Sequence, residues 1–270
     1  MKKPRAIILR TAGTNCDYET KAAFEMAGAL ADRVHINSII RGEVKLSDFQ
    51  ILALPGGFSY GDDIASGKIL ANELKYRLGD EIRKFDFASK PIIGICNGFQ
   101  VLVKMGILPG EKDYAQTATL TFNDSDKFES RWVYLKRQGA GVRGKGPKKA
   151  VNNFWIDGMP EVIRLPVAHG EGKFVTIESS ALNKIEDNGQ VAFRYCAPGG
   201  VKPEYPFNPN GSTNDIAGIC NQRGNVFGLM PHPERFVHAW QSPSKDEADI
   251  ISGDSAWGLK IFINAVKAAE

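Results

Sequence analysis

Residues 94–98 combine the residue types and the spacing of a nucleophilic centre. The sequence Gly94-Ile95-Cys96-Asn97-Gly98 follows an apolar run and precedes a segment with helical spacing. A Gly-x-nucleophile-x-Gly pattern between a strand and a helix is typical of a nucleophile elbow, whose tight turn leaves no room for β-carbons. The helix N-terminus would favour the Cys96 thiolate, and the Asn97 backbone N–H would be an oxyanion donor. A buried cysteine in an ordinary turn is the alternative, and the paired glycines make it the less favoured one.

A thiol nucleophile needs a base within hydrogen-bond reach, and the run Pro231-His232-Pro233-Glu234 supplies one. A residue before proline is pushed toward extended geometry, so we expect His232 to be extended. Side chains two residues apart in an extended segment point the same way, which would let Glu234 orient the imidazole. Taken alone, a surface histidine beside a Glu234–Arg235 ion pair explains the run better. Together with the elbow, the catalytic interpretation is favoured.

The loop at residues 55–63 follows another apolar run and contains Gly56, Gly57 and Gly61. Glycines at a strand end allow the backbone to approach a ligand or an oxyanion that forms at a carbonyl. An ordinary loop with permissive turns explains these glycines equally well.

The pattern of apolar runs predicts the elements that would position these residues. In the first half, short apolar runs alternate with helical patterns, which indicates a doubly wound parallel sheet with helices on both faces. Strands are expected at 6–9, 34–36, 51–54 and 91–95, and helices at 17–31, 68–87 and 99–105. In the second half, apolar runs follow one another without long helices, until a closing helix at 256–269. We predict one α/β domain spanning 1–270, with a mostly parallel central sheet and an antiparallel extension.

The composition excludes several classes of protein. Of the 270 residues, 43% are hydrophobic and 24% are charged, which is typical of a globular protein and not of a disordered or fibrous one. The net charge of +3 gives no general attraction to nucleic acid or to anionic membranes. No stretch approaches the roughly 20 apolar residues of a membrane helix, and the start lacks a secretory pattern. We therefore expect a cytoplasmic protein that binds neither nucleic acid nor membrane.

The four cysteines Cys16, Cys96, Cys196 and Cys220 are far apart, and none forms a Cys-x-x-Cys pair. This spacing predicts neither a disulfide framework nor a zinc site. We interpret Cys16, Cys196 and Cys220 as structural thiols, and we expect no metal in this chain.

Several segments together resemble a known family. Pro-Gly-Gly at 55–57, Gly-Ile-Cys-Asn-Gly-Phe-Gln at 94–100 and Pro-His-Pro-Glu at 231–234 are similar to the triad-type (class I) glutamine amidotransferases. Gly-Thr-Asn-Cys-Asp at 13–17, Gly-Phe-Ser-Tyr-Gly-Asp-Asp at 57–63 and Ala-His-Gly-Glu-Gly at 168–172 narrow the resemblance. With them, nearly the whole chain resembles the glutaminase subunits of phosphoribosylformylglycinamidine synthase, a family of purine biosynthesis.

The resemblance implies a role for each of the residues above. Cys96 would attack the amide of L-glutamine and form a thioester, with His232 as general base and acid, oriented by Glu234. The other implied contacts are the Gly57 and Asn97 amides as the oxyanion hole, Gln100 against the substrate, and His169 and Gly170 along the glutamine pocket.

The resemblance also implies partners. Ammonia would pass to a separate synthetase subunit, where ATP and formylglycinamide ribonucleotide react, and a small third subunit would complete the complex. No cofactor is expected in this chain, and ATP and Mg²⁺ would belong to the synthetase.

Two features leave alternatives open. The chain is longer than the common separate subunit, and we expect loop insertions near 136–160 and 197–215. The basic, glycine-rich stretch at 136–149 is expected to be a mobile loop, with a contact to the synthetase or a phosphate as the alternative.

Two alternative functions are also open for the chain. One is a stand-alone thiol hydrolase of γ-glutamyl or peptide bonds, and the other is a non-catalytic subunit that binds a partner.

Overall fold

The computed structural model describes residues 3–138, 151–244 and 249–270. A nine-stranded sheet with the order β2-β1-β3-β4-β11-β10-β9-β6-β7 runs through the molecule. Its parallel part consists of β2 (Leu30–His35), β1 (Arg5–Arg10), β3 (Ile51–Leu54), β4 (Ile92–Ile95) and β11 (Val226–Leu229). Its antiparallel extension consists of β10 (Ile216–Cys220), β9 (Val191–Cys196), β6 (Glu129–Arg137) and β7 (Val162–His169). The predicted doubly wound sheet with an antiparallel extension is confirmed.

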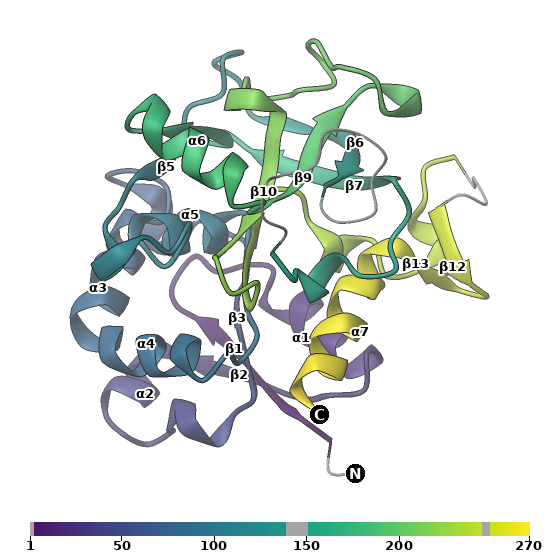
Figure 1. Cartoon of the computed structure of the whole chain (residues 1–270). Helices are drawn as coiled ribbons and strands as arrows, with labels where there is room; N and C mark the ends of the chain where they lie inside the picture. Colours follow the sequence, from purple (N-terminus) through teal and green to yellow (C-terminus); the bar gives the residue numbers. More distant parts are fainter. Residues whose placement is uncertain (1–2, 139–150, 245–248) are drawn as a thin grey trace.

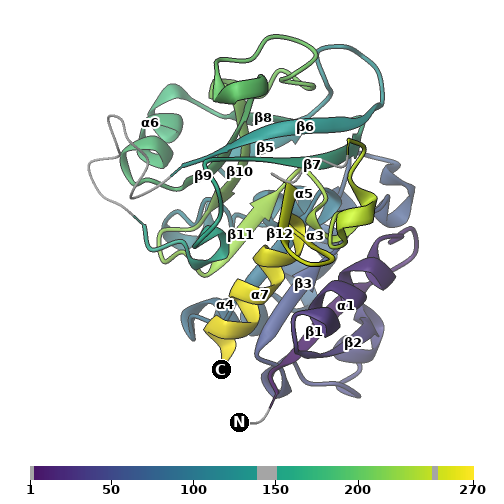
Figure 2. The ribbon, with the colours of Figure 1, turned by 90° about the vertical axis from the view of Figure 1, so that its right-hand side faces the viewer.

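Helices cover both faces of the parallel part (Figures 1 and 2). On one face, α1 (Asp17–Met26) packs against α7 (Trp257–Ala269), and the rings of Phe24 and Phe262 meet edge to face at 4.9 Å. The other face carries α2 (Ile36–Ile40), α3 (Lys68–Arg77), α4 (Gly79–Phe87) and α5 (Asn97–Lys104). Every residue of β3, β4 and β11 is buried, as expected for parallel strands covered on both sides.

The antiparallel part lies above these layers in Figure 1, and the other described strands and helix are two short strand pairs and α6. The strands β5 (Ala118–Thr121) and β8 (Lys173–Thr176) form a separate antiparallel pair, and α6 (Ser179–Asp187) follows β8. The short strands β12 (Ile250–Ser252) and β13 (Ser255–Ala256) form a further pair before α7. The sequence predicted no long helix between the strands of the second half, and it did not locate α6, a helix of nine residues whose apolar positions Ala181 and Ile185 are one helical turn apart and buried.

Two predicted helices have different bounds. The helix expected at 17–31 ends at Met26, because Gly28 adopts a φ of +104° that an L residue rarely adopts, and β2 begins two residues later. The helix expected at 68–87 is two helices, which meet where Leu78 leaves helical geometry with φ −131° and ψ 11°.

The structure describes the second expected insertion and part of the first. Residues 139–149 of the basic stretch lie outside the described residues, so that prediction stays untested. The end of the first insertion contributes Trp155, which is fully buried and stacks on Phe227 at 5.7 Å. The second insertion contains Asn210, whose side chain is also fully buried.

Parallel strands carry their loops to a common edge of the sheet. The segments that follow the carboxyl ends of β1, β3, β4 and β11 are those at 11–16, 55–67, 96–98 and 230–235. Open sheets of this kind bind ligands at that edge. Among the described residues, no helix has the length and apolar character needed to cross a membrane.

Candidate active site

Cys96 occupies a strained turn between β4 and α5. Its φ of +51° and ψ of −107° are rarely adopted by a residue with a side chain, and this strain is typical of a nucleophile elbow. The glycines on either side of Cys96 are required for the steric reason that the sequence predicts. A β-carbon on Gly98 would overlap the Leu54 carbonyl oxygen, and one on Gly94 would lie 2.5 Å from the Gly98 carbonyl oxygen.

We expect Gly98→Ala to lower the free energy of unfolding by about 3 kcal/mol, because the added methyl group must displace buried backbone of β3. Urea denaturation of the variant measures the loss. Gly79→Ala is the matched control, since a β-carbon there meets no atom closer than 3.4 Å and the position begins α4. Equal stability of both variants would contradict the packing explanation of the elbow.

His232 and Glu234 form a buried hydrogen-bonded dyad. Nδ1 of His232 and Oε1 of Glu234 are 2.6 Å apart, and the two residues are 1% and 2% exposed. His232 has the predicted extended backbone, with φ −104° and ψ 90°. Glu234, however, lies in a short 3₁₀ turn, Pro233–Arg235, so the turn and not strand alternation brings the carboxylate to the imidazole. The carboxylate accepts the Nδ1 proton, which leaves Nε2 for chemistry.

The charge of Glu234 favours a protonated imidazole. Burial opposes the charged form of His232, but the Glu234 carboxylate and the sulfurs of Cys96 and Cys16 outweigh it. The pKa of His232 is therefore raised well above its usual value. An imidazolium of this kind can stabilise a thiolate and can donate a proton to a leaving amine.

Cys96, His232 and Gly57 line one cavity of about 230 Å³ at the carboxyl edge of the sheet. Its other walls come from Asn15, Phe58, Phe128, Ala168 and Arg235. Among the described residues, Nε2 of His232 has no hydrogen-bond partner, so it is available to a reacting group.

Gly56 explains how closely these groups approach. A β-carbon there would lie 2.8 Å from Cε1 of His232 and 3.4 Å from Cβ of Cys96. The absence of a side chain at Gly56 therefore allows nucleophile and base to share one cavity.

Cys16, interpreted from sequence as a structural thiol, lies beside the dyad. It is fully buried, and its Sγ lies 4.0 Å from Nδ1 of His232 and accepts a hydrogen bond from Nη2 of Arg235 at 3.0 Å. Burial raises the pKa of the Cys16 thiol. Sequence reasoning missed this position because the two residues are 216 positions apart.

Cys16, His232 and Glu234 could together offer a thiol, an imidazole and a carboxylate to a metal ion, with ligand atoms within 4.8 Å of one another. The 2.6 Å between His232 and Glu234 is a hydrogen-bond distance, shorter than the roughly 3.3 Å between two ligand atoms on a tetrahedral zinc. The Arg235 guanidinium, which donates to the Cys16 sulfur, also places a positive charge beside the position that a metal cation would occupy. This geometry fits a catalytic dyad better than a metal site.

Gln100 and Asn97 belong to a buried network behind the elbow. Nε2 of Gln100 donates to the Glu171 carbonyl oxygen at 2.5 Å, and Nδ2 of Asn97 donates to Oε1 of Gln100 at 3.0 Å. Oδ1 of Asn97 accepts from Oγ of Ser59 at 2.6 Å, in the loop that follows Gly57. The Gln100 side chain therefore joins the elbow to two neighbouring loops instead of lining the cavity of Cys96.

His169 and Gly170 lie at the end of β7 and beyond it, next to the cavity-lining Ala168. Oδ1 of Asn123 and Nδ2 of Asn210 lie 3.1 and 3.5 Å from the His169 ring nitrogens. Burial, with the nearby charge of His232, lowers the pKa of His169 to about 3. His169 is therefore a neutral, buried group, and neither it nor Gly170 contributes to the wall of the cavity.

The pKa of His169 predicts acid sensitivity. An unfolded His169 binds a proton near pH 6.5 and the folded one only near pH 3, so between these values stability falls as the pH falls. The contribution is about 1.4 kcal/mol per pH unit. We expect His169→Gln to flatten the pH dependence of the unfolding free energy between pH 5 and 6.5, measured by denaturant titration. A slope equal to that of the unmodified chain would contradict the assignment.

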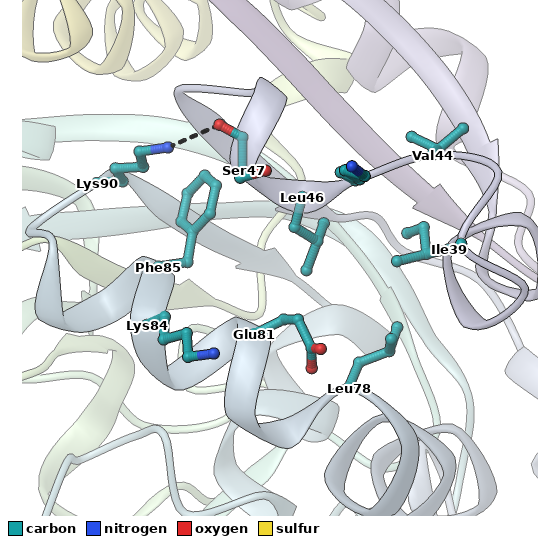
Figure 3. A pocket seen from close by; sticks show the side chains of 11 residues that line it. Ile39, Val44, Leu46, Ser47, Leu78, Glu81, Lys84, Phe85 and Lys90 are labelled. Atoms are coloured by element: carbon teal, nitrogen blue, oxygen red, sulfur yellow. Dashed lines mark hydrogen bonds between the residues drawn. The ribbon is translucent and has the colours of Figure 1, made fainter.

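A second cavity, of about 400 Å³, lies away from these residues (Figure 3). It is walled by segments that precede the amino ends of β3 and β4, including Leu46, Leu78, Phe85 and Lys90. The three apolar residues are at most 4% exposed, and Nζ of Lys90 already donates to the Phe49 carbonyl oxygen at 2.7 Å. None of the predicted site residues lines this cavity.

Comparison with known proteins agrees with this geometry. Residues 3–268 match the family model of the CobB/CobQ-like glutamine amidotransferase domain. The phosphoribosylformylglycinamidine synthase subunit PurQ of Dehalococcoides mccartyi is 46% identical, over 100% of this chain and 99% of that protein. PurQ of Treponema denticola is 44% identical, over 92% and 93%.

Among solved structures, a chain in the structure of PurLQS from Thermotoga maritima aligns with a TM-score of 0.70 and 30% identity, and the alignment covers all of both chains. The alignments with PurQ of Dehalococcoides mccartyi and with the Thermotoga maritima chain both span the whole of this chain. The chain belongs to the family of the phosphoribosylformylglycinamidine synthase subunit PurQ.

Proposed function

We propose that this chain is the glutaminase subunit of a phosphoribosylformylglycinamidine synthase. It hydrolyses L-glutamine to glutamate and ammonia. The observation that carries the proposal is the strained Cys96, which shares a cavity with a His232 whose Nδ1 is held by Glu234. A nucleophile, a base and a carboxylate that orients the base are the parts that acyl transfer through a thioester requires.

The reaction proceeds in two steps. The Cys96 thiolate attacks the amide carbon of glutamine, and the resulting oxyanion is stabilised by the backbone N–H groups of Gly57 and Asn97. Nε2 of His232 donates its proton to the leaving nitrogen, so that the C–N bond breaks and ammonia departs from a γ-glutamyl thioester. His232, now neutral, takes a proton from water. The hydroxide displaces the sulfur, which releases glutamate and restores the thiolate and the imidazolium.

The ammonia passes to a synthetase subunit, which makes formylglycinamidine ribonucleotide from formylglycinamide ribonucleotide and ATP. Support comes from the full-length similarity to PurQ proteins and from the match to a chain of a PurLQS structure. We assign ATP and Mg²⁺ to the synthetase, and no cofactor to this chain. A small third subunit completes the complex. We place the chain in the cytoplasm, where reducing conditions keep Cys96 a thiol.

The test is mass mapping of the chain after treatment with an electrophilic glutamine analogue, with and without excess glutamine. We expect a single adduct on Cys96 that glutamine suppresses. An adduct that glutamine does not suppress would favour a thiol hydrolase of other substrates. If the isolated chain is unlabelled, the labelling is repeated with the synthetase present, and absence of labelling there would favour a non-catalytic subunit.

A further inference from the structure

Asn123 is a buried side chain whose hydrogen bonds hold the segment that follows β7. Its Nδ2 donates to the carbonyl oxygens of His169 and Lys127, both at 2.8 Å. Its Oδ1 accepts from the Gly172 N–H at 3.0 Å, and its own N–H donates to the Gly170 carbonyl oxygen at 3.0 Å. With 2% of its surface exposed, Asn123 thus binds both ends and the middle of residues 169–172.

The same amide determines which nitrogen of His169 carries the proton. Because Nδ2 of Asn123 points at two carbonyl acceptors, Oδ1 faces Nδ1 of His169 at 3.1 Å and can only accept. Nδ1 is therefore the protonated nitrogen, and Nε2 accepts from Nδ2 of Asn210 at 3.5 Å. The segment is tightly packed around this ring, since a β-carbon on Gly172 would overlap the imidazole.

The segment held by Asn123 and the residue before it each contact the elbow. The carbonyl oxygen of Ala168, which precedes the segment, lies 3.7 Å from Sγ of Cys96. The Glu171 carbonyl oxygen accepts from Gln100, which in turn binds Asn97.

Asn97 extends these contacts to the loop that follows Gly57, the second proposed oxyanion donor. Its Nδ2 donates to Oδ1 of Asp62 at 3.1 Å and its Oδ1 accepts from Ser59, both in the loop after Gly57. A continuous chain of hydrogen bonds thus runs from residues 169–172 through Gln100 to Asn97, one of the two proposed oxyanion donors, and on to Ser59, two residues after the other donor, Gly57.

We propose that Asn123 is a positioning residue for the oxyanion hole, acting through residues 169–172 and Gln100. The inference rests on the proposed glutaminase function. An oxyanion forms only after attack on the amide, so misplaced donors lower kcat more than they raise KM. Removing one oxyanion donor costs about 10²–10³-fold in kcat, and displacing donors through a support should cost at least about tenfold.

The decisive variant is Asn123→Asp, assayed in the assembled complex with its synthetase. The carboxylate has nearly the same shape but cannot donate to the carbonyl oxygens of His169 and Lys127. We expect kcat for glutamine-dependent synthesis to fall at least about tenfold, with KM for glutamine changed less than about threefold and ammonium-dependent synthesis unchanged. Asn183→Asp, on the exposed face of α6, adds the same charge and should keep the kcat of the unmodified complex.

Three results would overturn the inference: an unchanged kcat with only a lower melting temperature, a rise in KM alone, or an equal loss in the Asn183 variant. If the unmodified complex itself shows no glutamine-dependent synthesis, the proposed function fails and the inference that rests on it fails with it; failure of the inference alone leaves the unmodified complex active.

A measurement on the unmodified chain covers the case in which Asn123→Asp does not fold. Nitrogen-15 NMR of the histidine rings, with His169 assigned by its absence in His169→Gln, reports which nitrogen is protonated. We expect a neutral ring with its proton on Nδ1 from pH 5 to 8. A proton on Nε2 alone, or an imidazolium in this range, would show that Asn123 does not hold the ring as inferred.

Discussion

Cys96→Ser should abolish glutamine-dependent synthesis while synthesis from added ammonium persists. The serine hydroxyl is a far weaker nucleophile than a thiolate, and an imidazolium at His232 cannot remove its proton. Loss of the nucleophile of a catalytic triad costs up to about 10⁶-fold in kcat, and we expect a loss of at least about 10⁴-fold here. The assembled complex, assayed with each nitrogen source, measures both activities.

The comparison of nitrogen sources makes this result specific. Ammonium bypasses the glutaminase site and requires only an intact complex, so its use shows that the variant still folds and binds its partner. Cys196→Ser changes another buried thiol, at the end of β9, and should retain both activities. Loss of both activities in the Cys96 variant would mean that Cys96 is structural.

Glu234→Gln should lower glutamine-dependent kcat by about 10²- to 10⁴-fold, because an amide of the same shape no longer stabilises the imidazolium.

The same substitution should change the titration of His232. The carboxylate of Glu234 raises the pKa of His232, so in the variant the imidazole should lose its proton at lower pH. In the unmodified chain, the ion pair stabilises the fold fully below pH 6.5, and this stabilisation is lost as the pH rises through the raised pKa. Glu234→Gln should remove this loss of stability at alkaline pH.

Ring NMR of His232 measures the titration directly, and denaturant titration from pH 6.5 upward measures the stability. Glu25→Gln, which removes a surface ion pair with Lys21 on α1, is the control and should leave kcat unchanged. An unaltered His232 titration in the Glu234 variant would show that another group stabilises the His232 imidazolium.

Local sequence determined much of the site. The tight strand-to-helix turn at Cys96 requires glycine on both sides, because a β-carbon at Gly94 or Gly98 would overlap backbone atoms, so the paired glycines are a local signal of this turn. Pro233 restricts the backbone of His232, the residue before it, in the same local way. Uninterrupted apolar runs identified the buried parallel strands, since only a strand covered on both faces is apolar at every position.

Some local features were still misread. The break at Leu78 and the helix α6 depend on which side chains find a core to pack against, and a helical pattern alone does not locate these ends. Glu234 was correctly paired with His232, but its position comes from a 3₁₀ turn that the extended-segment argument did not anticipate.

Only the tertiary structure placed Cys16 beside His232 and Asn123 beside His169. Neither Cys16 nor Asn123 has a local signal of its role, because its partners come from other strands and loops. The pairing of β6 with β7, in which Glu129 lies opposite His169, brings the loop of Asn123 to the end of β7. Residue types and short-range sterics determined the reacting groups, whereas strand order and register determined the groups that hold them, because those contacts join segments far apart in the chain.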